Sequence, residues 1–152
     1  MDIGFVSFCM GANSTIIAQS KAPEKFSKVK CQMLIQPISM DVFVDTYTKK
    51  TYTKFIAALL MPTIRVFVKM LSGKKLEDLS PRNYVKDIRI PTLYIQAKND
   101  PWTDLSDIKG FYNDTKATKE FFWIENTKHR FESYTYFETK PEKMLEFLKK
   151  WM

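Results

Sequence analysis

Apolar residues are gathered into four short runs, at residues 2–9, 29–38, 91–97 and 121–124. Within each run they give apolar character to both faces of an extended chain, which is typical of buried strands in a parallel sheet. The stretches between the runs have helical periodicity instead. They lie at residues 14–20, 41–87, 104–112 and 141–151. This alternation predicts an α/β fold, with a parallel sheet of about four strands and flanking helices.

The helical region at residues 41–87 carries three local signals. Asp41 is a candidate N-cap, Pro62 predicts a kink, and Gly73 is placed to end a helix. The same region holds a stripe of large apolar side chains that could either cover a pocket or pack onto the core. The stripe consists of Phe43, Tyr47, Tyr52, Phe55, Leu59, Leu60, Phe67 and Met70. The length of 152 residues fits one domain, so we expect a single domain over residues 1–152.

The chain is basic, with a net charge of +7, which raises the possibility of nucleic-acid binding. The lysines are spread along the chain, and the densest pairs, at residues 49–50, 74–75 and 149–150, lie far apart in sequence. Basic residues do not alternate with aromatic residues as they do in RNA-binding motifs. We therefore expect a solvated lysine-rich surface and no nucleic-acid partner.

Several weaker signals in the sequence bear on the cellular compartment of the protein and on whether it binds a cofactor. The N-terminus lacks the basic region of a signal peptide, and the apolar tract 55–68 is interrupted by Pro62 and Arg65. Cys9 and Cys31 each lie in an apolar run, which suits a reducing compartment. We expect a cytoplasmic protein with no membrane span, no metal and no cofactor.

The pentapeptide at residues 7–11, Ser-Phe-Cys-Met-Gly, lies between the first strand and the first helix. This is the context of a nucleophile elbow, in which a tight strand-to-helix turn presents the nucleophile. Cys9 would lie at the N-terminus of a helix, where the dipole favours a thiolate, and the Met10 N–H would face a developing oxyanion. The small residues Ser7 and Gly11 would let the backbone double back. Cys9 is equally readable as a small buried strand residue.

Two later positions favour the catalytic interpretation of Cys9. Asp100 follows the third strand, and His129, the sole histidine, follows the fourth. Nucleophile, acid and histidine occur in this order in α/β-hydrolases, each after a strand. His129 would accept the Cys9 proton, and Asp100 would orient the imidazole. Asp100 could instead simply form a turn with Pro101, and His129 could be a surface residue.

Other acidic and aromatic residues compete for roles in the same site. Asp41 follows the second strand and is the main rival acid, with Asp104 and Asp107 behind it. Trp102 beside Asp100 and Phe131 beside His129 could line a substrate-binding site, or could be ordinary core or rim residues.

The turn at residues 9–11 resembles that of dienelactone hydrolase-like α/β-hydrolases, which use cysteine. The strand entered through residues 90–93, the Asp100 loop and the terminal helix with residues 147–148 resemble the C-terminal half of the superfamily. The resemblance implies a partial α/β-hydrolase fold with a helical cap at about residues 41–87. It also implies hydrolysis of ester, thioester or lactone bonds, or a related acyl transfer. Ser7 in place of the usual glycine and the large cap depart from the small dienelactone hydrolases.

Members of this superfamily place several strands before the elbow strand, and an early loop supplies a second oxyanion donor. Here the elbow strand starts at residue 2, so we expect the N-terminal strands to be absent and hydrolysis by the chain alone to be negligible. Truncation, a partner chain, or pairing of two copies through the open edge of the first strand would each account for this. The rival function is a non-catalytic remnant or binding module of the same fold.

Overall fold

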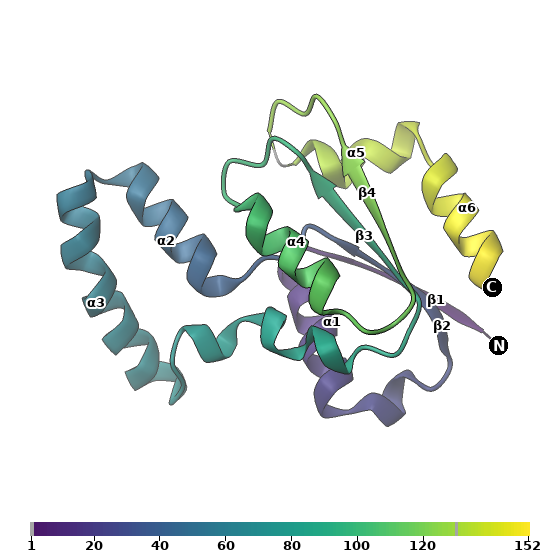
Figure 1. The fold of residues 1–152 in the computed structure, drawn as a ribbon, viewed down its shortest axis with the longest axis horizontal. Coiled ribbons are helices and arrows are strands. Elements are labelled where there is room, and N and C mark those ends of the chain that lie inside the picture. The colour runs from purple at the N-terminus through teal and green to yellow at the C-terminus, as the bar shows by residue number, and fades with distance from the viewer. Residues whose placement is uncertain (1, 130) are drawn as a thin grey trace.

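The computed structural model describes residues 2–129 and 131–152. Its sheet has four strands, β1 (Ile3–Phe8), β2 (Val29–Ile35), β3 (Thr92–Ala97) and β4 (Lys119–Ile124). They lie in the order β1-β2-β3-β4, and every neighbouring pair is parallel (Figure 1). The predicted α/β class and the four parallel strands are therefore confirmed.

The helices occupy the connections and the C-terminal region. They are α1 (Met10–Lys21), α2 (Met40–Thr51), α3 (Lys54–Ser72), α4 (Leu105–Asp114), α5 (Glu132–Thr139) and α6 (Glu142–Trp151), with short 3-10 helices η1 (Pro23–Phe26), η2 (Glu77–Leu79) and η3 (Pro81–Asp87). The first helix begins at Met10, directly after Cys9, and not at the predicted residue 14. α5 falls in a stretch for which no element was predicted.

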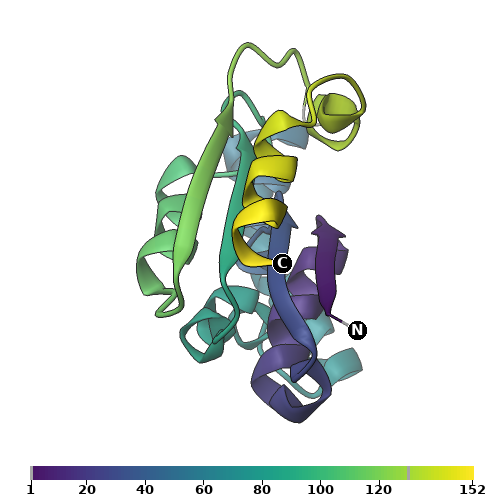
Figure 2. The ribbon, with the colours of Figure 1, turned by 90° about the vertical axis from the view of Figure 1, so that its right-hand side faces the viewer.

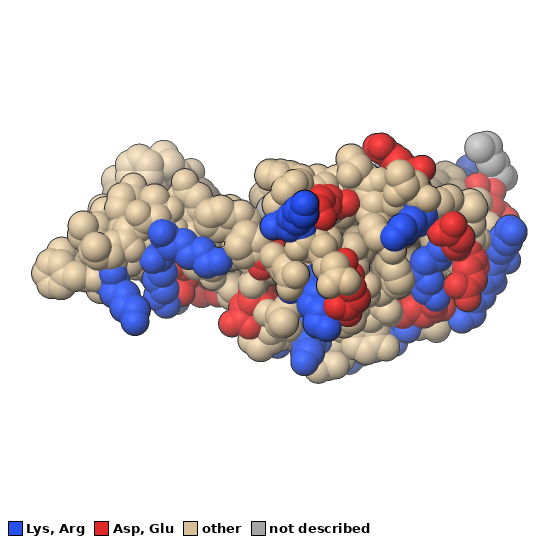
Figure 3. Space-filling view, turned by 90° about the horizontal axis from the view of Figure 1, so that it is seen from above, with Lys and Arg blue, Asp and Glu red and all other residues tan. Residues whose placement is uncertain are grey.

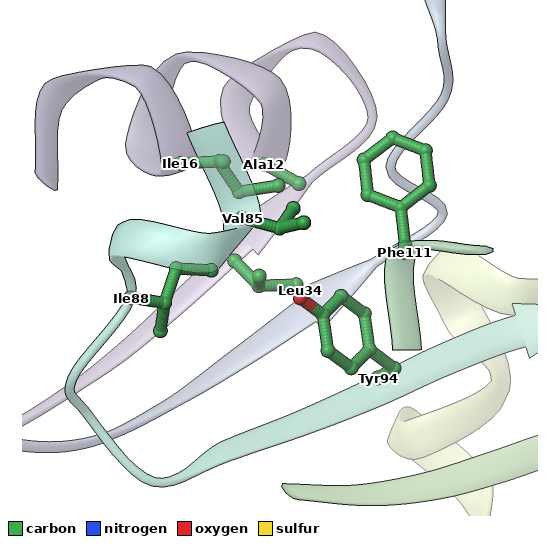
Figure 4. Packing of buried hydrophobic residues seen from close by; sticks show 7 residues of the cluster. All are labelled: Ala12, Ile16, Leu34, Val85, Ile88, Tyr94 and Phe111. Carbon is green, nitrogen blue, oxygen red and sulfur yellow. The ribbon is translucent and has the colours of Figure 1, made fainter. Parts of the chain in front are cut away.

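Alternating side chains of the central strands build two separate cores, one on each face of the sheet. Leu34 and Tyr94 face α1, η3 and α4, as Figure 4 shows. Their neighbours Ile35 and Ile95 face the opposite side, where Phe147 of α6 packs against them. The helices thus form a layer on each side of the sheet (Figure 2). Strands buried on both faces explain the continuous apolar runs in the sequence.

α2 and α3 form a helical hairpin that projects away from the sheet (Figure 1). Asp41 is not the N-cap of α2, because the helix begins one residue earlier and Ser39 takes the cap position. The Ser39 hydroxyl makes no capping bond and instead donates to Asp107 Oδ1, at 2.8 Å. α3 continues through Pro62 and ends at Gly73, which has the expected left-handed conformation, with φ 69°.

β1 has the apolar sequence of a central strand, but it forms the open edge that was expected when the preceding strands are absent. It lies at the edge of the described sheet and pairs with β2. Its apolar side chains remain partly exposed: Ile3, Phe5, Val6 and Phe8. An exposed apolar edge of this kind favours pairing with a further strand.

Two substitutions on α6 should separate core packing from surface effects. Phe147 is 1% exposed and fills the core between α6 and the sheet, whereas Leu145 on the same helix is 47% exposed. We expect Phe147→Ala to lower the free energy of unfolding by about 3–5 kcal/mol, because it leaves a cavity. Leu145→Ala should change it by less than about 0.5 kcal/mol. Urea denaturation followed by circular dichroism measures both, and equal losses would contradict the packing described.

Candidate active site

Cys9 occupies a sharp turn between β1 and α1. Its backbone has φ 46° and ψ −116°, a combination that a non-glycine residue rarely adopts. The Cys9 N–H donates to the carbonyl oxygen of Ile35 at 2.8 Å, and the Cys9 carbonyl accepts from the N–H of Asn13 at 3.1 Å. The turn is therefore held by the sheet on one side and by the helix on the other. Strained backbone of this kind is concentrated at functional sites.

The first residue of α1, Met10, is the predicted oxyanion donor. N–H groups in the first turn of a helix lack intrahelical acceptors, so they are available to an anion. The expected steric demand for a small residue at position 11 is not found. A Cβ placed on Gly11 meets no heavy atom within 4 Å among the described residues. Among the described residues, no side chain or backbone therefore packs against the turn at Gly11.

Asn13 fixes this turn to the loop that follows β2, a role that the sequence did not reveal. Its side-chain Nδ2 donates to the Ile38 carbonyl at 2.9 Å, and its Oδ1 accepts from the Ile38 N–H at 3.0 Å. Both bonds are buried, so the start of α1 and the end of β2 move together. An asparagine one turn after the elbow is the only sequence signal for this contact.

Asp100 lies in the loop after β3 and is almost fully buried. Its Oδ1 accepts from the backbone N–H of Trp102 at 2.9 Å. Its Oδ2 lies near two buried amides, Nε2 of Gln36 at 3.4 Å and Nε2 of Gln96 at 3.5 Å. Among the described residues, three donors therefore lie around this buried carboxylate at the carboxyl end of the sheet.

Gln36 is a second residue that the sequence did not reveal. It follows β2 directly, has φ 52°, and its N–H donates to the Ile95 carbonyl at 2.8 Å. Cys9 binds the last residue of β2, and Gln36 binds β3 in the same way, so the two residues lie side by side at the same end of the sheet. Gln36 thus stands on the strand between Cys9 and Asp100. Its buried Oε1 lacks a hydrogen-bond partner among the described residues.

His129 lies in the loop after β4, as predicted, but its ring points outward. The side chain is 61% exposed, and Nε2 lies 3.6 Å from the carboxylate of Glu132. Among the described residues, the structure records no hydrogen bond from this ring to Cys9 or Asp100. The loop itself adjoins the Asp100 loop, because Asn99 Nδ2 donates to the Thr127 carbonyl at 3.3 Å. The structure therefore brings the two loops together without bringing the imidazole to the acid.

The rival acids lie elsewhere. Asp41 is in the first turn of α2 and borders a hollow that also contacts Asp107. Asp107 binds Ser39 and the Arg82 guanidinium. Burial raises the pKa of its carboxyl, although these two contacts act to lower it. Asp104 caps α4 by accepting from the Ser106 N–H at 2.7 Å, and this hydrogen bonding lowers its pKa. Asp107 and Asp104 therefore have structural roles that explain them.

The two predicted substrate-binding aromatics have different surroundings. The Trp102 ring packs on α2, with ring centroids 5.2 Å from Tyr47 and 6.5 Å from Phe43. Phe131 is largely exposed and contacts the ring of Tyr134, which in turn packs on Phe8 beside the elbow. Trp102 therefore joins the hairpin to the acid loop, and Phe131 joins the histidine loop to the end of β1.

Solved structures with the same architecture establish the fold. An esterase from Pyrococcus furiosus matches 99% of this chain and 55% of its own, with 24% identity and a TM-score of 0.67. An acylaminoacyl peptidase from Pyrococcus horikoshii matches 99% of this chain and 24% of its own, at 20% identity and TM-score 0.61. An esterase from Exiguobacterium antarcticum matches 98% and 67%, at 14% identity and TM-score 0.63. The fold is that of part of an α/β-hydrolase.

A family model narrows this class. It describes the PhoPQ-activated pathogenicity-related proteins and matches residues 38–152. Because the match includes more than half of the chain, the protein belongs to this family. The match contains Asp100 and His129 but begins after Cys9. The uncharacterized protein YqkD of Bacillus subtilis is 29% identical over 76 residues, which span 50% of this chain and 25% of that relative.

The two cysteines should differ sharply in reactivity. Cys31 is completely buried between the sheet and α6, and burial raises the pKa of its thiol, whereas Cys9 is partly exposed. We expect iodoacetamide to label Cys9 at least about tenfold faster than Cys31 in the native protein. Peptide-resolved mass spectrometry measures both rates in one sample. Unfolding in urea should make the rates similar, and equal rates in the native protein would contradict the described burial.

Proposed function

We propose that the protein is a hydrolase of ester, thioester or lactone bonds that uses Cys9 as its nucleophile. The observation that carries the proposal is the backbone of Cys9, with φ 46° and ψ −116° at the N-terminus of α1. A strand-to-helix turn of this shape presents a side chain at the carboxyl end of a parallel sheet, where α/β folds build their sites. The narrower resemblance to cysteine-using dienelactone hydrolases supports the choice of bond.

In the proposed reaction His129 takes the proton of the Cys9 thiol, and the sulfur attacks the acyl carbon of a small-molecule substrate. The carbonyl oxygen becomes an oxyanion facing the N–H of Met10. The protonated imidazole then gives its proton to the leaving group, which departs and leaves an acyl-cysteine. Water, deprotonated by His129, hydrolyses this intermediate and restores the thiol. Asp100 holds the imidazolium during both steps.

This mechanism requires the ring of His129 to leave Glu132 and turn toward Asp100. The contact with Glu132 opposes this rotation only weakly, because the histidine is largely exposed and Nε2 lies 3.6 Å from the carboxylate. The Asn99 contact to Thr127 keeps the histidine loop beside the acid loop during such a rotation. A side-chain rotation with a modest loop adjustment is therefore the proposed step that assembles the triad.

The edge position of β1 adds a condition. We propose that the active form pairs β1 with an additional strand, supplied by further N-terminal residues of a longer protein, by a partner chain or by a second copy. The exposed apolar residues of β1 and the open space beside Gly11 support this. The segment that pairs with β1 would also supply the second oxyanion donor.

A non-catalytic binding module is the second candidate, and one observation favours it. The orientation of His129 toward Glu132, away from the acid, is what a surface loop without catalytic duty would show. Acyl transfer to an acceptor other than water would use the same groups and is a variant of the first candidate. Nucleic acid is not proposed as a partner of either.

Alkylation of Cys9 distinguishes the two candidates without requiring turnover. If His129 assists the thiol, His129→Ala should slow iodoacetamide labelling of Cys9 by about tenfold near neutral pH. Lys128→Ala, which changes the neighbouring exposed residue, is the matched control and should leave the rate unchanged. Labelling that is equally fast in both variants and the unmodified protein would favour the binding module.

Hydrolysis of p-nitrophenyl acetate tests the condition on β1. Residues 1–152 alone would present one oxyanion donor, and loss of a donor costs about 100- to 1,000-fold in rate. We therefore expect the purified chain to hydrolyse the ester close to the rate of the Cys9→Ala control. Robust hydrolysis by the monomer that disappears in Cys9→Ala would overturn the requirement for an added strand while confirming the nucleophile.

A further inference from the structure

The outer face of α3 is an apolar surface that the described residues leave uncovered. Phe55, Leu59, Val66 and Met70 are spaced by four, seven and four residues, so they lie on one face of the helix. Their exposed fractions range from 60% to 77%. Of the two alternatives for the predicted stripe, packing onto the core is therefore wrong for Phe55, Leu59 and Met70.

The opposite face of α3 already has its partner. Ala57 and Met61, one turn apart, are buried where α3 packs on α2. α3 is thus apolar on its inner side, which the hairpin covers, and apolar on its outer side, which the described residues do not cover. An 18-residue window of α3 has a mean hydropathy of 1.7, yet only 11% of that window is buried. In length and composition the helix could cross a membrane, contrary to the expectation from Pro62 and Arg65.

Basic residues accompany this apolar face. One flank of α3 carries Lys54, Arg65 and Lys69. Their spacings of eleven and four residues correspond to nearly whole turns, so they lie on the same side of the helix. Residues 40–75 contain seven lysines and arginines and two aspartates, an excess of five positive charges. Figure 3 shows the hairpin as a mostly uncharged projection with lysine and arginine side chains along one side. The combination of an apolar face and a basic flank is typical of helices that lie in a membrane interface.

We propose that the α2–α3 hairpin docks on an anionic lipid surface through the outer face of α3. Phe55, Leu59, Val66 and Met70 enter the boundary between headgroups and acyl chains, and Lys54 and Lys69 contact anionic headgroups. A second copy of the chain is the less suitable occupant. A two-fold contact through this face would bring the basic flanks of both copies, with Lys54 and Lys69, close together. Repulsion between these like charges opposes association.

The hairpin lies on the surface and does not cross it. A crossing α3 would require α2 to return through the bilayer, but its 12 residues span only about 18 Å. The hydrocarbon core is about 30 Å thick. Arg65 would also enter that core, whereas in the structure it forms an exposed ion pair with Glu77 at 2.6 Å. Interfacial docking leaves this ion pair and the packing of α3 on α2 intact.

Sedimentation of the full chain with vesicles tests the proposal. We expect binding to phosphatidylcholine vesicles that contain phosphatidylserine, weaker binding without it, and weakening by salt. Leu59→Gln combined with Val66→Gln should reduce binding by roughly tenfold or more, because two exposed apolar side chains are lost. Leu145→Gln, an equally conservative change at an exposed leucine of α6, should have no effect. Each of Lys54→Gln and Lys69→Gln should cost roughly fivefold, and Lys149→Gln on α6 should not.

The outcomes separate lipid from protein as the occupant. Absence of binding to anionic vesicles overturns the proposal, as does binding that Leu145→Gln weakens as much as the α3 variants do. Concentration-dependent dimerisation that the α3 variants abolish, without vesicle binding, would assign the face to a second copy and also overturn it. Circular dichroism of each variant verifies that the substitutions leave the fold intact. None of these measurements depends on the chemistry of Cys9, so this proposal and the proposed hydrolase can fail separately.

Discussion

The conformation of Cys9 depends on the parallel pairing of β1 with β2. The last bond of that pairing, from the Cys9 N–H to the Ile35 carbonyl, holds the residue at the sheet while α1 starts immediately behind it. A positive φ at a non-glycine residue costs about 1–3 kcal/mol, so the surrounding contacts must supply that energy. Asn13 contributes by binding both backbone groups of Ile38. The geometry of the candidate site therefore rests on the sheet and on one buried amide.

The parallel sheet explains why the loops that carry the candidate residues are neighbours although they are distant in sequence. Parallel strands end at one edge, so the residues after β1, β2, β3 and β4 are neighbours by construction. This is why the order of Cys9, Asp100 and His129 along the chain was enough to predict the loops that carry them. It also explains why Gln36 was missed. A glutamine after a strand has no distinctive pattern, and its approach to Asp100 follows only from the order of β2 and β3.

The features that the sequence could not predict depend on orientation rather than on periodicity. Apolar periodicity identified α3 as a helix. Because the helix is apolar on two faces, its sequence does not show which face packs against the rest of the protein. The position of His129 after β4 was predictable, yet the direction of its ring depends on the contact with Glu132 in α5, a helix that was not foreseen. The apolar sequence of β1 is that of a strand buried on both sides, and its open edge was predictable only from the strands expected before it.

The hairpin and the candidate acid are mechanically connected through Trp102. Its ring is held by Tyr47 and Phe43 of α2, and the Lys50 ammonium lies 5.7 Å from the ring centroid. Its backbone N–H, meanwhile, donates to Asp100 Oδ1 at 2.9 Å. A displacement of α2 must therefore either break these ring contacts or move residue 102 and, with it, a donor to the acid. The Lys50 ammonium of α2 also donates to the Pro101 carbonyl in the same loop, so α2 contacts the acid loop at two adjacent residues.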